Sequence, residues 1–312
     1  MPLDPQIQQM LDAIDAGPDR KETHEMEPAE AREGYRALGS LLGKGPEVGE
    51  VSDRSIPGPD GEIPVRIYQP VGSGERGVTV FFHGGGWVIG DLDTHDKECR
   101  ILCSEADCVV VAVDYRLAPE HRFPAAVEDS TAAYQWVCEH AAELGAAPGR
   151  VAVAGDSAGG NLAAVVAQWA RDHDVTPPRI QVLVYPAVDL REGIDYPSRV
   201  ENAAGPFLLT ATVDYFLAHY MGDAASGPLE PTASPLLGDL AGLPPALVVT
   251  AEYDPIRDQG EAYARALEEA GVEVSLHRYD GMPHIFFQLG PAFAASRELL
   301  SECAGALRAA LK

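Results

Sequence analysis

The chain has 312 residues, of which 46% are hydrophobic and 23% are charged, and this balance is typical of a globular protein with a large buried core. Its 48 acidic and 23 basic side chains give a formal net charge of −25, which disfavours nucleic acid and anionic membranes as partners because like charges repel. No run of about 18 apolar residues occurs, so the sequence predicts no membrane span.

The first residues and the cysteines indicate the compartment. Residues 1–6 provide neither a basic n-region nor an apolar h-region, so we expect no secretory signal. The five cysteines include no C-x-x-C pair and no Cys/His pair with zinc-site spacing. Reduced thiols in a cytoplasmic protein are therefore the expectation.

Residues 1–45 read as polar helix with one apolar stripe, formed by Leu3, Ile7, Met10, Leu11 and Ile14. Two interpretations of this stripe remain open. It either packs on the core of the protein or covers a substrate.

From about Val78 onward, short Val-rich runs alternate with helical patterns, which predicts strands that are covered on both faces of a parallel sheet. The runs are 78–82, 109–113, 151–154, 180–185 and 246–250, and the main helical patterns are 125–144, 162–172 and 259–270. The sequence thus predicts an α/β protein with a doubly wound, mostly parallel sheet flanked by helices. Right-handed crossovers place the carboxyl ends of the strands at one edge, where ligands bind.

A glycine run follows the first of these strands, in His83–Trp87 (H-G-G-G-W). Glycine lets backbone N–H groups approach a reacting oxygen closely, so Gly85 and Gly86 are candidate oxyanion donors. A phosphate-binding loop is the rival interpretation, but neither G-x-x-x-x-G-K-[ST] nor G-x-G-x-x-G spacing is present. We expect His83 to fix this loop by hydrogen bonds rather than to act as a base.

Four residues shortly after the glycine run, Asp91, Asp93, His95 and Asp96, cluster like metal ligands. The pair Asp93–Thr94 precedes a helical pattern, however, and such a pair is typical of a helix N-cap. We therefore expect no metal site.

The segment Gly155–Gly159 (G-D-S-A-G) lies between a predicted strand and a predicted helix, as a nucleophile elbow requires. Ser157 is therefore the candidate nucleophile, and the N–H of Ala158 is a third candidate oxyanion donor. The alternative is a serine that caps an ordinary helix. For Asp156 we expect a local structural role.

Residues from about 190 to 230 interrupt the alternation with Pro197, Pro206 and Pro228, and include a short helical piece near 212–220. We interpret them, together with the N-terminal segment, as a cap over the ligand-binding edge. The expected organisation is a catalytic core of residues 46–190 and 230–312, with a helical cap of residues 1–45 and 191–229.

A hydrolase elbow requires an acid and then a histidine later in the chain. His277 alternates within a predicted strand, whereas His284 follows Gly281-Met282-Pro283 beyond the carboxyl end of that strand, so His284 is the better candidate base. Asp189 and Asp254 each follow a predicted core strand, and both remain candidate acids on position alone. Asp258 reads as a first-turn helix carboxylate.

Four ordered motifs carry a family resemblance: H-G-G-G-W at 83–87, D-Y-R-L-A-P-E at 114–120, G-D-S-A-G-G at 155–160 and D-P-I-R-D at 254–258. Together they resemble the hormone-sensitive-lipase family of bacterial esterases, in the branch with G-D-S-A-G at the elbow. The resemblance implies an α/β-hydrolase fold with a helical cap and no cofactor. It favours Asp254 as the acid through its D-P-x-x-D context, and Gly85, Gly86 and Ala158 as the oxyanion hole.

The predicted function is therefore a serine carboxylesterase with Ser157, His284 and Asp254 as its triad. The resemblance implies a preference for esters of short to medium acyl chains. An amidase or peptidase-like acyl hydrolase and a catalytically silent ligand-binding protein are the alternatives. The expected partner is a small-molecule ester, and a homodimer is the assembly considered.

Trp87, Phe207 and the N-terminal stripe are the candidate walls of the acyl pocket. A bulky indole at Trp87, beside the glycine loop, would favour short acyl chains, and simple core packing is an equal alternative for this residue.

Overall fold

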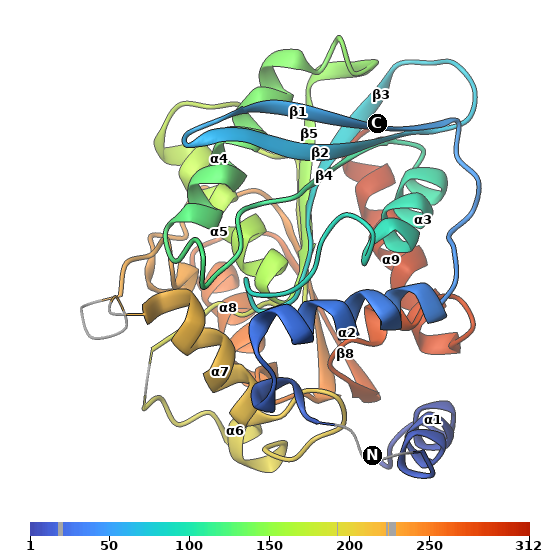
Figure 1. Cartoon of the computed structure of the whole chain (residues 1–312). Helices are drawn as coiled ribbons and strands as arrows, with labels where there is room; N and C mark the ends of the chain where they lie inside the picture. The colour runs from blue at the N-terminus through green and yellow to red at the C-terminus, as the bar shows by residue number, and fades with distance from the viewer. Residues whose placement is uncertain (18–20, 192, 223, 225–228) are drawn as a thin grey trace.

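The computed structural model describes residues 1–17, 21–191, 193–222, 224 and 229–312, and its centre is an eight-stranded sheet in the order β1-β2-β4-β3-β5-β6-β7-β8 (Figure 1). The strands are β1 (Glu50–Gly58), β2 (Gly61–Gln69), β3 (Arg76–Phe82), β4 (Val109–Val113), β5 (Ala146–Asp156), β6 (Gln181–Val184), β7 (Ala246–Tyr253) and β8 (Val274–Pro283). The pairs β1–β2 and β2–β4 are antiparallel, and all pairs from β4 to β8 are parallel. The predicted mostly parallel α/β sheet is confirmed.

All five predicted core strands are present, but the β1–β2 hairpin at the sheet edge was not predicted. Most residues of β1 are exposed or half-buried. An edge strand with one solvated face lacks the continuous apolar run by which the buried strands were recognised. The hairpin therefore has no comparable signature in the sequence.

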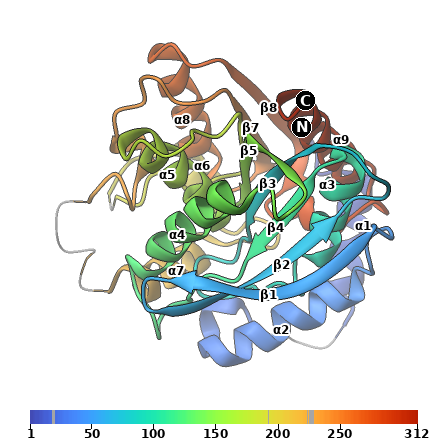
Figure 2. The ribbon, with the colours of Figure 1, turned by 90° about the horizontal axis from the view of Figure 1, so that it is seen from above.

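Helices cover both faces of the sheet (Figures 1 and 2). The face with α4 (Ala125–His140), α5 (Ala158–Asp172) and α8 (Arg257–Glu269) forms one hydrophobic cluster, and the face with α3 (Asp96–Ala106) and α9 (Ala294–Ala310) forms a second. Within β4, Val109 and Val111 belong to the first cluster and Val110 to the second. This alternation follows from the two-residue repeat of a strand.

A third group of helices lies at the carboxyl edge of the parallel strands (Figure 1). It comprises η1 (Thr23–Glu25), α2 (Pro28–Leu41), α6 (Pro197–Glu201) and α7 (Thr210–Met221). The two chain segments that supply these helices contact each other: His24 Nδ1 lies 3.1 Å from Thr212 Oγ1, and the Tyr215 hydroxyl donates to the Met26 carbonyl. Of the ranges expected to form a cap, residues 18–20, 192, 223 and 225–228, including Pro228, lie outside the described residues.

The short elements η3 (Pro235–Leu237) and η4 (Phe286–Leu289) precede β7 and follow β8. Among the described helices, none is both long and apolar enough to cross a membrane. All five cysteines are free thiols. Burial raises the pKa of Cys108 to about 12, so this thiol stays protonated at neutral pH.

The apolar stripe of α1 (Pro5–Asp15) packs on the core. Ile7 is fully buried in the cluster shared with α9, and Leu3, Met10 and Leu11 pack against that cluster. The Asp4 carboxylate accepts from Gln6 N and caps the helix. The backbone N–H of Asp4 donates to the Gly281 carbonyl at 3.0 Å, so the start of α1 is also bound to the end of β8.

Ile7→Ala should lower the free energy of unfolding by about 2–4 kcal/mol, because it leaves a cavity in a packed cluster. The measurement is equilibrium denaturation in urea. Gln9→Ala on the exposed face of the same helix is the matched control and should change stability by less than about 0.5 kcal/mol. Equal effects of the two changes would contradict the packing role of the stripe.

Candidate active site

Ser157 occupies the tight turn between β5, which ends at Asp156, and α5, which begins at Ala158. Its φ of 55° is a left-handed conformation that costs a non-glycine residue about 1–3 kcal/mol. A backbone hydrogen bond from Ser157 N to the Val184 carbonyl, 2.8 Å long, ties the turn to β6. Ser157 stands at the N-cap position of α5, but its side chain makes no capping hydrogen bond. The alternative of an ordinary capping serine is therefore wrong.

The glycines on either side of Ser157 are required by close backbone contacts. A Cβ on Gly159 would lie 1.9 Å from the Phe82 carbonyl oxygen, and one on Gly155 would lie 2.3 Å from the Gly159 carbonyl oxygen. No side chain fits at either position. The turn therefore presses directly on the end of β3.

Three polar side chains from distant parts of the chain meet beside the turn. Asp254 directly follows β7 and His284 directly follows β8, so both stand at the carboxyl edge of neighbouring strands. His284 Nε2 lies 3.0 Å from Ser157 Oγ, and His284 Nδ1 lies 2.7 Å from Asp254 Oδ2. The other oxygen of the fully buried Asp254 accepts from Ile256 N at 2.9 Å. The imidazole thus bridges a hydroxyl and a fixed carboxylate.

The rival base is placed elsewhere. His277 lies on β8 with its side chain 55% exposed, and it contacts Glu302. It has no route to Ser157, because it belongs to the strand and not to the loop beyond it.

The rival acids also have other partners. Asp189 accepts hydrogen bonds from Arg191 and Tyr196 and does not contact His284. Burial would raise the pKa of Asp189, but these hydrogen bonds outweigh burial and lower it. Asp258 lies in the first turn of α8, as expected, where its carboxylate accepts from Ser198 N.

The glycine loop after β3 supplies the predicted oxyanion donors. Gly85 and Gly86 have φ of 118° and 59°, and a Cβ on Gly86 would lie 2.2 Å from the Phe216 ring of α7. Within the described part of the chain, neither N–H is used in a hydrogen bond. Ala158 is the first residue of α5, where an N–H has no partner within the helix. The structure places all three on the wall of one cavity with Ser157 and His284, and their role as donors stays a prediction.

His83 supports this loop. Its Nδ1 lies 2.7 Å from the Gly84 carbonyl, its own carbonyl accepts from the Tyr115 hydroxyl, and the two rings stack at 4.3 Å. Burial, together with the nearby His95, lowers the pKa of His83 to about 4. The ring is therefore neutral at neutral pH and serves to hold the loop.

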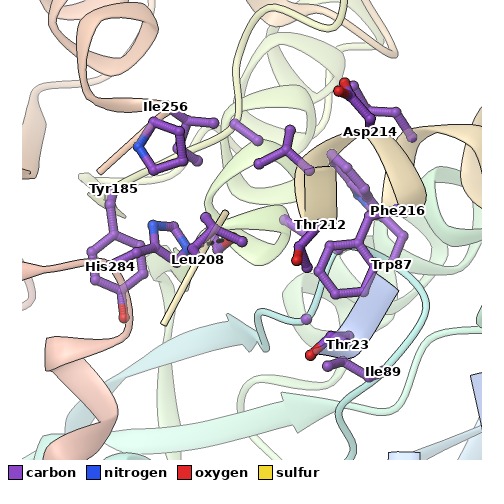
Figure 3. A pocket seen from close by; sticks show the side chains of 18 of the residues that line it. Thr23, Trp87, Ile89, Tyr185, Leu208, Thr212, Asp214, Phe216, Ile256 and His284 are labelled. Atoms are coloured by element: carbon purple, nitrogen blue, oxygen red, sulfur yellow. Dashed lines mark hydrogen bonds between the residues drawn. The ribbon is translucent and has the colours of Figure 1, made fainter. Parts of the chain in front are cut away.

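The cavity has a volume of ≈ 720 Å³ and lies between the strand ends and the third group of helices (Figure 3). His284 and Tyr185 form one side of it, and Trp87 and Phe216 form the opposite side (Figure 3). Trp87 also stacks on Tyr220 at 4.3 Å and is 2% exposed, so it is part of the core as well as of the cavity wall. Its role as a wall of the acyl pocket stays a prediction. Phe207 lines the cavity as well.

The N-terminal stripe is not part of this wall. Leu3, Ile7, Met10 and Leu11 pack on the core. The N-terminal residues that line the cavity instead come mainly from η1 and α2, among them Tyr35 and Leu38. The expectation that the stripe forms an acyl-pocket wall is wrong, because α1 is bound to the end of β8 and packs against the cluster that contains α9, and none of its residues lines the cavity. Figure 1 shows α1 as a helix apart from α2.

Most residues of the cavity wall were not found from the sequence, and Tyr185 and Gln288 are two of them. The Tyr185 ring lies 4.3 Å from the His284 ring, and Gln288 lies four residues beyond His284 in η4. Tyr185 immediately follows β6, and the rule that ligands bind at the carboxyl ends of strands would have indicated it. No sequence signal distinguishes Gln288.

The acidic segment before α3 is built differently from the prediction. Helix α3 begins at Asp96 with His95 as its N-cap, so the expectation of a cap at Asp93–Thr94 is wrong. The Thr94 hydroxyl is bound to the backbone of Asp91 instead, and Asp91 Oδ1 accepts from the N–H groups of Asp93 and Thr94. Among the residues that the structure describes, no three His, Cys, Asp or Glu side chains are grouped to hold a metal ion.

Comparisons with known proteins agree with this architecture. A family model described as alpha/beta hydrolase fold matches residues 79–288. The carboxylic ester hydrolase LipN of Mycobacterium tuberculosis is 50% identical over 86% of this chain and 72% of its own length. An ethyl acetate hydrolase of Pseudomonas putida is 39% identical over 93% of both chains. The structure of a hyperthermophilic esterase from the archaeon Pyrobaculum calidifontis, 42% identical, superposes with a TM-score of 0.93 over 99% of both chains.

Gly159→Ala should lower the free energy of unfolding by about 3 kcal/mol, because the new methyl group collides with the Phe82 carbonyl. Gly305→Ala in α9 is the matched control: nothing lies within 4 Å of the added Cβ, so it should stabilise the protein by up to about 1 kcal/mol. Urea denaturation measures both. Equal tolerance of the two alanines would show that the elbow is not tightly packed.

Proposed function

The chain belongs to the hormone-sensitive-lipase-like family of α/β-hydrolases and is a carboxylic-ester hydrolase, and on this premise we propose that it cleaves esters of short to medium acyl chains through Ser157, His284 and Asp254. The observation that carries the proposal is the continuous pair of contacts from Asp254 through His284 to Ser157 Oγ, 2.7 Å and 3.0 Å long. This is the arrangement in which a base within hydrogen-bond reach activates a hydroxyl.

In the first half of the reaction, His284 Nε2 takes the proton of Ser157 Oγ as this oxygen attacks the ester carbonyl. The imidazolium then gives the proton to the departing alcohol, and an acyl-enzyme remains on Ser157. Asp254 keeps the Nδ1 proton in place and stabilises the imidazolium. Its buried carboxylate is held by Ile256 N, so the ring cannot turn away from the hydroxyl.

In the second half, water replaces the alcohol. His284 removes a proton from the water as it attacks the acyl-enzyme, and the acid product leaves as Ser157 recovers its proton. In both halves negative charge develops on the former carbonyl oxygen. The N–H groups of Gly85, Gly86 and Ala158 stabilise this charge because they line the same cavity and the two glycine N–H groups have no other acceptor among the described residues.

The limited size of the substrate follows from the third group of helices. We propose that this group, within the expected ranges 1–45 and 191–229, is a cap domain over a core of residues 46–190 and 230–312. Helix α1 falls in the first range but packs on the core, so it is not part of the cap. The cavity of ≈ 720 Å³ is bounded by η1, α2 and α7, and Phe216 of α7 stands against Gly86. Trp87 and Phe207 supply apolar walls for the acyl chain. A long chain would have to displace the packed helices.

Incubation with p-nitrophenyl esters of increasing chain length tests the proposal. Hydrolysis should be fastest with short to medium acyl chains, and matched anilides should react far more slowly. An organophosphonate should add one adduct to the intact protein, on Ser157. Ser157→Ala should lose the adduct and about 10⁶-fold in kcat, because the triad acts as a unit. Unchanged hydrolysis in Ser157→Ala would contradict the assignment.

Asp254→Asn should lower kcat by about 10⁴-fold, because the amide holds the wrong imidazole tautomer and cannot stabilise the imidazolium. Asp189→Asn is the matched control, since Asp189 also follows a core strand but binds Arg191 and Tyr196; it should cost less than about tenfold. Steady-state kinetics on p-nitrophenyl acetate distinguishes the two. The reverse ranking would make Asp189 the acid.

A further inference from the structure

A buried pair of titratable side chains lies beneath the glycine loop, at the margin of the substrate cavity, which Asp156 helps to line. It consists of Asp156, the last residue of β5, and His95, the residue before α3, which are 2% and 1% exposed. His95 Nε2 lies 3.3 Å from Asp156 Oδ1. The same oxygen accepts a hydrogen bond from Gly84 N at 2.9 Å, and the other carboxylate oxygen lies 2.3 Å from where a Gly84 Cβ would stand. The carboxylate therefore fills the place of a side chain beneath the loop.

The hydrogen bonds around His95 identify the nitrogen that always carries a proton. The Thr94 hydroxyl donates to the Asp91 carbonyl at 2.8 Å, so it can only accept from His95 Nδ1, which lies 2.9 Å away. Nε2 faces the Asp156 carboxylate and the Gln288 amide, at 3.3 Å and 2.7 Å. Gln288 Oε1 accepts from the Tyr35 hydroxyl at 2.7 Å, so the amide nitrogen faces His95 Nε2, as suits a neutral ring. A protonated ring requires the amide to turn over, which presents its oxygen to Nε2 and its NH2 group to the Tyr35 oxygen.

Two buried imidazoles lie 5.5 Å apart here, and their surroundings shift their pKa values in opposite directions. Burial opposes charge on His95, but the Asp156 carboxylate outweighs burial and raises the pKa of His95. Burial and His95 lower the pKa of His83 to about 4. The titratable groups that face His95 are Asp156, Glu98, Asp91, His83 and Tyr35. The Asp156 carboxylate therefore favours the protonated form of His95, whereas the His83 ring is neutral at neutral pH.

The location of Asp156 makes its charge important for the reaction. It immediately precedes Ser157, and it binds the residue before Gly85, so it adjoins both the nucleophile and the oxyanion donors. A carboxylate without a positive partner in this buried region would repel the negative oxygen that forms in the reaction, because two like charges are poorly screened away from water. An imidazolium beside the carboxylate cancels this repulsion and leaves its hydrogen bond to Gly84 intact.

We propose that Asp156 and His95 are positioning residues for the oxyanion loop: the Asp156 carboxylate holds Gly84, and the His95 imidazolium neutralises that carboxylate so that it does not oppose the developing oxyanion. The proposal rests on the proposed ester hydrolysis at Ser157. It extends that function, because both residues act through the position of Gly84 and neither supplies a reacting atom.

The experiment compares His95→Gln, Asp156→Asn and the double variant on p-nitrophenyl acetate. His95→Gln leaves a buried, unneutralised carboxylate and should lower kcat about thirtyfold, with KM within twofold, because the loss is confined to the transition state. Asp156→Asn keeps an oxygen for Gly84 N without the charge and should cost about threefold. The double variant has no charge to neutralise, so its kcat should return to that of Asp156→Asn.

If His95→Gln lowered kcat only by disturbing the packing, the added Asp156→Asn substitution would lower kcat further. A double variant that is more active than His95→Gln therefore cannot be explained by lost packing. The rate of organophosphonate labelling of Ser157 should follow the same order, because that reaction also places negative charge in the oxyanion site. His173→Gln, on the exposed end of α5, is the matched control and should match the wild type. Thermal melting shows that each variant is folded.

The outcomes separate the two proposals. A wild-type protein that neither hydrolyses the ester nor takes the label would refute the proposed function. A wild type that does both, with His95→Gln within twofold of it, would refute the positioning role alone. If His95→Gln does not fold, the kcat of the double variant is compared with that of Asp156→Asn, and equal values support the proposal. A double variant that is far slower than Asp156→Asn, or that does not fold, overturns it.

Discussion

The contact between the elbow and the end of β3 is the constraint on which the site depends. The Phe82 carbonyl would lie 1.9 Å from a Cβ on Gly159, and Phe82 pairs with Gly155 in the sheet. Phe82 is the last residue of β3, so the glycine loop begins where this contact is made. One backbone approach therefore sets the distance between the proposed nucleophile and the proposed oxyanion donors, and it leaves no room for a side chain.

The helices over the cavity are joined to the core by polar contacts as well as by apolar packing. Arg32 of α2 donates to the carbonyls of Val88 and Ala118 and pairs with Glu120. The Asn202 amide, at the end of α6, donates to the carbonyls of Glu252 and Asp254 at 3.1 Å. The hydrogen bonds to the four carbonyls are buried or half-buried and directional, so they determine the position of the helices relative to the core. The cavity shape is thereby linked to the strand ends that carry the polar side chains.

The sequence predicted the buried strands of the sheet but not the hairpin at its edge. The buried strands were recognisable because both of their faces are apolar, as in the Val109–Val113 run. The β1–β2 hairpin has one solvated face, and its pattern resembles that of a loop. The stripe of α1 was identified as apolar, but amphipathicity says only that a face is buried and not against what. The structure places it against the core, while η1 and α2 line the cavity.

Some features of the site follow from the sequence alone. The glycines around residues 84–86 and 155–159 and the positions of Asp254 and His284 just beyond strands could be read directly, because local backbone chemistry dictates them. The choice between Asp189 and Asp254 could not be made from position, since each follows a core strand. Only the tertiary structure decides it: β7 and β8 are neighbours, so Asp254 meets His284, while Asp189 follows β6 and is bound by Arg191. The buried pair of His95 and Asp156 was likewise invisible, because 61 residues separate two side chains that only the packing of α3 beside the sheet brings together.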